Sequence, residues 1–74
     1  MYRRSWIVKP VINGFQFQLL VWGTEEEMRS YMEHEFKECP AYRGATEEEV
    51  DQMSKMGAKV YLAPPLTRRY NNEA

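Results

Sequence analysis

The dipeptide Asn13-Gly14 constrains this chain more than any other feature, because it separates two segments rich in apolar residues. Asn and Gly adopt positive φ at low cost, so the pair favours a type I′ turn whose twist matches the flanking strands. We therefore predict a β-hairpin over residues 6–22. A two-residue loop also fixes the register, since partners across the hairpin keep a constant sum of residue numbers.

This register gives the hairpin two unlike faces. One face carries only apolar pairs, namely Ile12 with Phe15, Pro10 with Phe17, Val8 with Leu19 and Trp6 with Val21. The other face is mixed and carries Val11 with Gln16, Lys9 with Gln18, Ile7 with Leu20 and Ser5 with Trp22. The first face should pack into the core, while the second should be partly hydrated. Because Pro10 cannot donate to the ladder, its strand is expected at a sheet edge or interrupted at this residue.

A capping box follows the hairpin at Thr24-Glu25-Glu26-Glu27, where Thr24 can cap a helix and Glu27 can reach back to it. The next apolar residues have helical spacing and form one stripe that can cover the hairpin: Met28, Tyr31, Met32, Phe36 and Cys39. Pro40 disfavours helical geometry at the residue before it, so this helix should end near Glu38.

The rest of the chain contains a second capping box, followed by a segment in which apolar and polar residues alternate. Residues 40–45 are predicted to be a loop, after which Thr46-Glu47-Glu48-Glu49 begins a shorter helix. The apolar side of this helix consists of Val50, Met53 and Met56. Gly57 stands where a left-handed C-terminal cap is favoured. Residues 58–63 alternate as a third strand, which should join the hairpin.

These elements predict an α+β fold with the order ββααβ. The expected architecture is a two-layer sandwich in which a small, mainly antiparallel, three-stranded sheet carries both helices on one face. We assign residues 1–66 to a single domain and predict a flexible polar tail at residues 67–74. The position and direction of the third strand stay open, since either strand of the hairpin could receive it.

Composition indicates a soluble globular protein, with 43% hydrophobic and 28% charged residues. The single cysteine, Cys39, excludes an internal disulfide framework and fits a reducing compartment. The first residues lack the apolar core of a signal peptide, and no apolar run reaches the roughly 20 residues of a membrane helix. We therefore expect a cytoplasmic protein that does not associate with membranes. A chain of this size buries little surface, which makes a homodimer a reasonable expectation.

The sequence offers little for catalysis, because one histidine and one cysteine give no spacing that joins a nucleophile, a base and an orienting group. We predict a protein that is not an enzyme and needs no cofactor. His34, Glu38 and Cys39 form the best metal candidate but lack a fourth ligand, so we interpret them as an exposed histidine and a buried thiol. Glu35 should face the sheet, either as an acid of raised pKa or, as we prefer, as a residue that reaches water or a partner.

The mixed face of the hairpin is the strongest candidate for an interface. Ile7, Leu20 and Trp22 project away from the expected helical layer, and an exposed tryptophan in an apolar patch is typical of a protein interface. The rival interpretation is that the third strand or the tail folds over this face through Tyr61 or Leu66. The acidic helix starts, Glu25, Glu26, Glu47 and Glu48, suit a basic partner, although such glutamates are also ordinary helix-dipole chemistry.

We therefore predict a small non-enzymatic protein-binding module, of adaptor or inhibitor type, that docks a partner or a second copy of itself. The acidic helices would tune the choice of partner. The alternative is a nucleic-acid-binding protein in which Arg3, Arg4, Arg68 and Arg69, with neighbouring tyrosines, converge into a basic patch. The small number of basic residues and the net charge of −1 weigh against this alternative.

Overall fold

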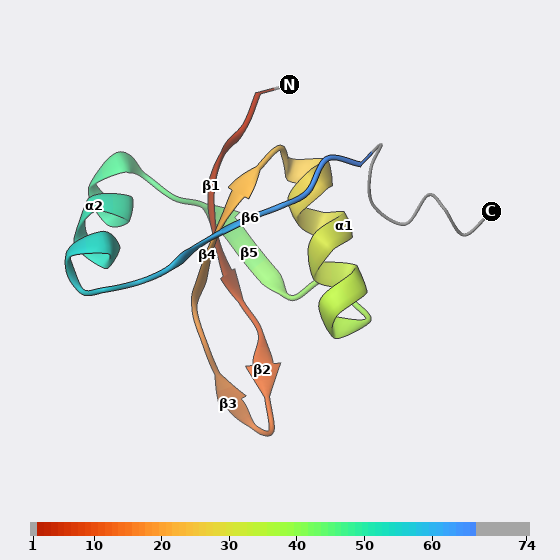
Figure 1. The fold of residues 1–74 in the computed structure, drawn as a ribbon. Coiled ribbons are helices and arrows are strands. Elements are labelled where there is room, and N and C mark those ends of the chain that lie inside the picture. The colour runs from red at the N-terminus through yellow and green to blue at the C-terminus, as the bar shows by residue number, and fades with distance from the viewer. Residues whose placement is uncertain (1, 67–74) are drawn as a thin grey trace.

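A computed structural model describes residues 2–66, so the predicted tail lies outside the described residues. In chain order the elements are β1 (Arg4–Lys9), β2 (Val11–Ile12), β3 (Phe15–Gln16), β4 (Leu19–Gly23), α1 (Glu25–Phe36), β5 (Ala41–Gly44), α2 (Glu47–Lys55) and β6 (Val60–Leu62). Four strands form one sheet in the order β5-β1-β4-β6, while β2 and β3 form a separate ribbon (Figure 1). The fold is therefore α+β with a mainly antiparallel sheet, as predicted.

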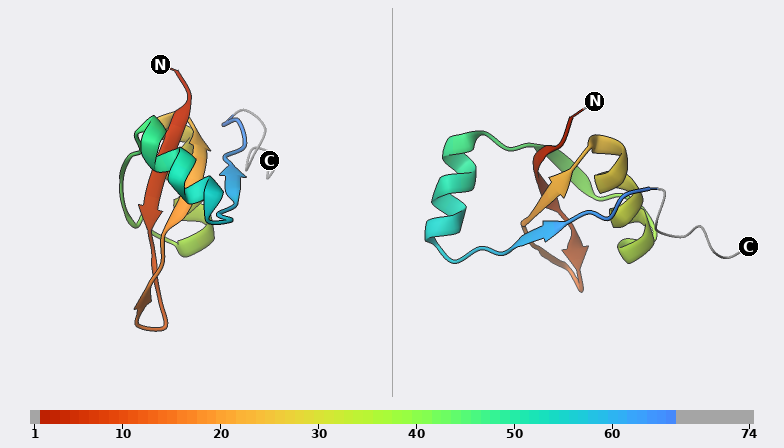
Figure 2. Two further views of the ribbon diagram at one scale, coloured as in Figure 1. Left: turned by 90° about the vertical axis from the view of Figure 1, so that its left-hand side faces the viewer. Right: turned by 45° about the horizontal axis from the view of Figure 1, so that its top comes forward.

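The predicted hairpin and its register are confirmed. Asn13 and Gly14 have φ angles of 53° and 83°, as a type I′ turn requires. β1 pairs antiparallel with β4 and places Trp6 opposite Val21. The ladder is interrupted at Pro10, which lacks an N–H and separates β1 from β2. Beyond this residue the ribbon of residues 11–18, here called the arm, projects from the body of the molecule (Figures 1 and 2).

α1 begins with the predicted capping box. The Glu27 N–H donates to Thr24 Oγ1 at 3.1 Å, and the Thr24 N–H donates to Glu27 Oε1 at 3.0 Å. The helix ends at Phe36 because Lys37 adopts a left-handed conformation with φ 71°, slightly before the expected end at Glu38. Glu27 is 7% exposed and also accepts a hydrogen bond from the Arg3 guanidinium at 3.1 Å.

α1 covers one face of the sheet, as its apolar stripe predicts. The buried centre of this layer consists of Val8, Val21, Met28 and Met32. The side chains packed around it are Trp6, Leu19, Tyr31, Phe36, Cys39, Tyr42, Tyr61 and Ala63. The apolar face of the hairpin is core only as far as Pro10, because the arm extends past the helix. Phe15 and Phe17 in the arm are therefore 69% and 46% exposed.

The prediction that both helices share one face is wrong. Residues 41–44, expected in a loop, form the edge strand β5 and pair antiparallel with β1. The chain leaves this edge toward the opposite side, so α1 and α2 lie on either side of the sheet (Figures 1 and 2). β6 joins the hairpin as predicted, but it is the fourth strand of the sheet and runs parallel to β4.

The position of α2 corrects the expectation that Ile7 and Leu20 on the mixed face of the hairpin form part of an exposed interface. Ile7 and Leu20 are 2% and 1% exposed, and Val50 and Met53 of α2 pack against them. They belong to a second small core and are unavailable for docking. Trp22, two residues beyond Leu20 on the same face, remains 42% exposed.

An ion pair ties α2 to the edge strand. The Arg43 guanidinium donates two hydrogen bonds to the Glu49 carboxylate, at 2.9 and 2.7 Å. Glu49 also accepts the Thr46 N–H at 3.0 Å and completes the second predicted capping box. The guanidinium, followed by this backbone N–H, lowers the pKa of Glu49 from 4.5 to about 2.

We expect Glu49→Gln to change the pH dependence of stability. Because the pKa of Glu49 is lower in the folded protein, its ionised form stabilises the fold above about pH 4.5, and this contribution is lost as the pH falls toward 2. The variant should unfold at lower urea concentration at pH 7 and lose less further stability between pH 4.5 and 2. Glu48→Gln, an exposed neighbour in the same turn, is the control; an equal change in both variants would contradict the prediction.

We expect Glu27→Ala to lower the free energy of unfolding by about 1–2 kcal/mol, because it removes the helix cap and leaves Arg3 without its carboxylate. Urea denaturation followed by circular dichroism measures the change. Glu26→Ala, which removes an exposed acid from the same turn, should alter stability by less than about 0.5 kcal/mol. Similar losses in the two variants would show that Glu27 acts only through the helix dipole.

Candidate protein-docking groove

Trp22 is exposed because of the strand alternation and the length of α2. Leu20 and Trp22 point to the same side of β4, the side that α2 covers. α2 has nine residues and is therefore only about 14 Å long. It covers Leu20 and leaves Trp22 beyond its edge.

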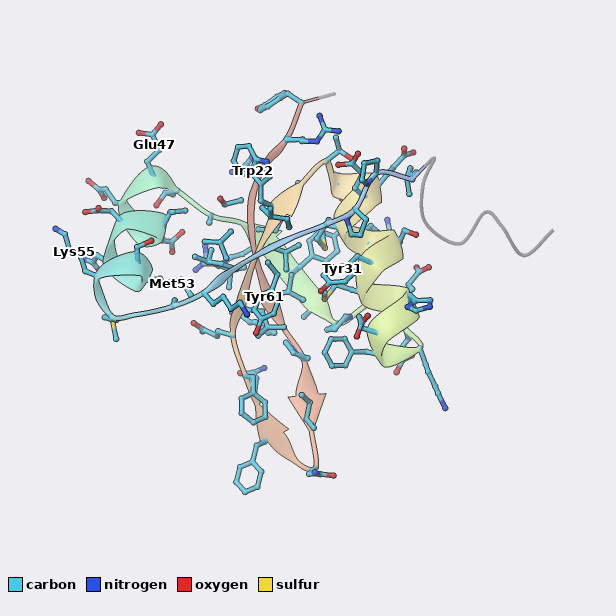
Figure 3. The ribbon with its side chains drawn as sticks, in the orientation of Figure 1. Trp22, Tyr31, Glu47, Met53, Lys55 and Tyr61 are labelled. Carbon is cyan, nitrogen blue, oxygen red and sulfur yellow. The ribbon has the colours of Figure 1, made fainter. Side chains whose placement is uncertain are left out.

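Trp22 lines an open groove of about 620 Å³. Residues 2–5 line it from the N-terminal strand, and Glu47, Val50 and Asp51 line it from α2. Figure 3 shows Trp22 and Glu47 at the same end of the molecule. The groove therefore joins an aromatic side chain to a carboxylate that lies 25 positions further along the chain.

An exposed apolar strip continues from the groove onto the sheet edge. Leu62 of β6 is the register partner of Trp22, and Val60 is the partner of Leu20. Residues paired in this way share one face of the sheet, so Val60 and Leu62 lie on the same side as Trp22. Their exposed fractions are 38% and 70%. Trp22, Val60 and Leu62 form the apolar strip.

The two arginines of the groove are engaged within the fold. Arg3 binds the Glu27 carboxylate, and Arg4 donates to the Ala45 carbonyl at 3.2 Å. The Arg4 guanidinium also lies 5.1 Å from the ring centroid of Trp6. A Cβ at position 44 would stand 2.5 Å from that guanidinium, so Gly44 leaves the space that Arg4 occupies.

The acidic side of the groove is less engaged. Asp51 pairs with Lys55 at 3.2 Å, and both side chains are largely exposed. Within residues 2–66, the exposed Glu47 carboxylate makes no hydrogen bond or ion pair. Glu47 is the first residue of α2, where the positive end of the helix dipole favours its charge. The groove thus presents an available carboxylate beside Trp22.

The other acidic residues proposed for docking lie apart from the groove. The Tyr42 hydroxyl donates to the Glu25 carboxylate at 2.5 Å, and this hydrogen bond raises the pKa of Tyr42. Glu26 is exposed on α1, and Glu48 is exposed on α2 without lining the groove. Of the seven predicted docking residues, only Trp22 and Glu47 line the groove.

His34 and Glu35 lie on the exposed surface of α1, whereas Cys39 follows the helix. The His34 and Glu35 side chains are 58% and 49% exposed and approach within 3.7 Å of each other. Glu35 therefore reaches water, as we preferred. Cys39 is half-buried, and this burial raises the pKa of its thiol. Over residues 2–66, no group of three or more His, Cys, Asp or Glu side chains is arranged to hold a metal ion.

The basic cluster of the alternative function is described only in part. Tyr2, Arg3 and Arg4 lie together along the groove, whereas Arg68 and Arg69 lie outside the described residues.

Sequence reasoning missed Leu62, because the alternation of residues 58–63 does not show which side meets the core. The structure turns Tyr61 toward α1 and leaves Leu62 in solvent.

In the described part of the chain, neither helix has the length and hydrophobicity needed to cross a membrane. Comparisons with protein-family models, with curated proteins and with solved protein structures find no match to this chain.

Proposed function

We propose that this chain is a non-enzymatic protein-binding module whose groove docks a partner segment carrying an apolar side chain next to a basic one. The observation that carries this proposal is the half-exposed indole of Trp22 in a groove, beside the exposed Leu62. Tryptophan is among the residues that contribute most to binding when a partner covers them.

The apolar strip supplies the attractive surface. A buried aromatic side chain removes roughly 150–250 Å² from water, and Trp22 retains 42% of its exposure in the isolated chain. Val60 and Leu62 extend the same surface along the sheet edge, which suits an extended partner segment. Contiguous exposed apolar residues of this kind are characteristic of interaction sites.

The charges of the groove favour a basic partner. Arg3 already binds a carboxylate of this chain, and Arg4 binds a carbonyl. The Glu47 carboxylate, in contrast, is available to bind a basic group of a partner. Charges at the rim of an interface act mainly on the association rate and on partner choice. Glu47, helped by Asp51, is therefore proposed to select a lysine or arginine adjacent to the apolar residue that covers Trp22.

The same contacts argue against nucleic acid as the principal ligand. Phosphate binding would have to compete with Glu27 for Arg3 and with the Ala45 carbonyl for Arg4. It would also bring phosphates close to Glu47 and Asp51 on the other side of the groove. Like charges placed together in this way oppose binding.

Selection of random peptides displayed on phage against the immobilised protein tests the proposal. We expect the selected peptides to share an aromatic or large aliphatic residue next to Lys or Arg. Trp22→Ala should weaken their binding 10- to 100-fold in fluorescence anisotropy, as expected for a tryptophan at the centre of an interface. Glu47→Gln should lower the association rate and its dependence on salt.

Glu48→Gln is the matched control and should bind like the wild type, because Glu48 does not line the groove. Peptide binding that survives Trp22→Ala unchanged would overturn the proposal. Tight binding of a single-stranded oligonucleotide that falls steeply with salt and requires Arg3 and Arg4 would favour the nucleic-acid alternative instead.

A further inference from the structure

We infer that the arm is a self-association element, and that two copies of this chain pair by seating each arm against α1 of the other copy. This surface is separate from the groove at Trp22. The arm projects from the body of the molecule (Figures 1 and 2). Its β2 and β3 strands pair with each other and join no other strand of the described chain.

One side of the arm carries a row of exposed apolar side chains. Ile12 and Phe15 are register partners, and Phe17 follows Phe15 on the same side by strand alternation. Their exposed fractions are 39%, 69% and 46%. We call Ile12, Phe15 and Phe17 the arm row. An isolated two-stranded ribbon is only marginally stable in water, so a surface that covers the arm row would stabilise it.

A matching pocket lies at the root of the arm. It encloses about 240 Å³ between the arm, α1 and β6. Its apolar lining residues are Ile12, Leu19, Tyr31, Met32, Phe36 and Tyr61. Figure 3 shows Tyr31 and Tyr61 above the root of the arm. Glu35 also lines the pocket, and its carboxylate is half-exposed and able to stay in water.

The arm cannot fill its own pocket. Ile12 already forms part of the lining, while Phe15 lies next to the turn at the far end of the arm. In a dimer, a two-fold rotation can lay the two arms side by side and antiparallel, so that the tip of each arm meets the root of the other. It places Phe15 of each copy beside the pocket at the root of the other, which gives the self-complementary contact of a symmetric dimer.

The charge pattern favours a second copy as the occupant. No charged residue occurs from Pro10 to Thr24, so the arm has no charge with which to select a charged partner. Exposed strand edges in monomeric proteins are normally protected from pairing by charged residues, especially lysine, or by proline. The edges of the arm lack charged protection, and like edges can pair without repulsion.

The available area indicates a weak dimer. From their exposed fractions, Phe15 and Phe17 together can bury roughly 170–290 Å² in each copy. With Ile12 and the pocket walls, the interface reaches only the low end of specific interfaces, near roughly 1,200 Å² in total. We therefore expect a dissociation constant on the order of micromolar or weaker, with a concentration-dependent equilibrium.

Sedimentation velocity over a wide range of protein concentration tests the inference. The wild type should shift from monomer toward dimer as concentration rises. Phe15→Ser and Phe17→Ser should raise the dissociation constant at least tenfold. Val11→Ser is the matched control, because Val11 is 64% exposed in the same arm but lies on the opposite side. This variant should dimerise like the wild type, and so should Trp22→Ser.

Isotope-filtered NMR on a mixture of labelled and unlabelled protein supplies a second measurement. It should show contacts between the Phe15 ring of one copy and the Tyr31 or Phe36 ring of the other. A wild type that stays monomeric at every concentration would overturn the inference. It would also fail if Val11→Ser dissociated the dimer as fully as Phe15→Ser, or if a dimer formed without these contacts. Dissociation by Trp22→Ser alone would assign self-association to the groove.

Discussion

The antiparallel pairing of β1 with β4, fixed by the type I′ turn at Asn13-Gly14, is the constraint on which the other elements depend. These two strands are the inner strands of the sheet, and a helix packs on each of their two faces. Val8 and Val21 face α1, while Ile7 and Leu20 face α2. A shift of the register by one residue would turn one strand over relative to the other, so that Ile7 would share a face with Val21 and Val8 with Leu20. Each helix therefore packs on a surface that the turn defines.

The elements that are determined by a few adjacent residues could be predicted from the sequence. The turn, its register and both capping boxes are properties of a few adjacent side chains, and all of them were predicted. β5 could not be predicted in this way, because Ala41-Tyr42-Arg43-Gly44 has neither strong alternation nor a run of strand-forming residues. Its structure depends on hydrogen bonds to β1, more than 30 positions away. The error about β5 led directly to the wrong side for α2, because a loop would have left the chain on the side of α1.

The candidate site was predictable in part for the same reason. The register alone placed Trp22 on the face away from α1. Its exposure depends in addition on α2, which buries Leu20 on the same face and stops short of Trp22. The groove around it could not be predicted, since it exists only where α2 crosses the sheet next to residues 2–5.

The exposure of the arm follows from the lengths of α1 and of the hairpin strands. Twelve helical residues span about 18 Å, whereas the eight residues 6–13 of an extended strand span about 26 Å. The helix is too short to cover the hairpin, and the excess becomes the arm.

The distribution of the buried side chains along the chain also has a consequence for synthesis. Val8, Val21, Met28 and Met32, the buried centre beneath α1, all lie within the first 36 residues. A chain emerging from the ribosome therefore exposes a hairpin and a helix that can collapse on each other before β5, α2 and β6 have emerged. The later elements add to an existing template: β5 pairs with β1 along one edge, and β6 pairs with β4 along the other. Ile7 and Leu20 stay open to water, and to chaperones, until α2 arrives.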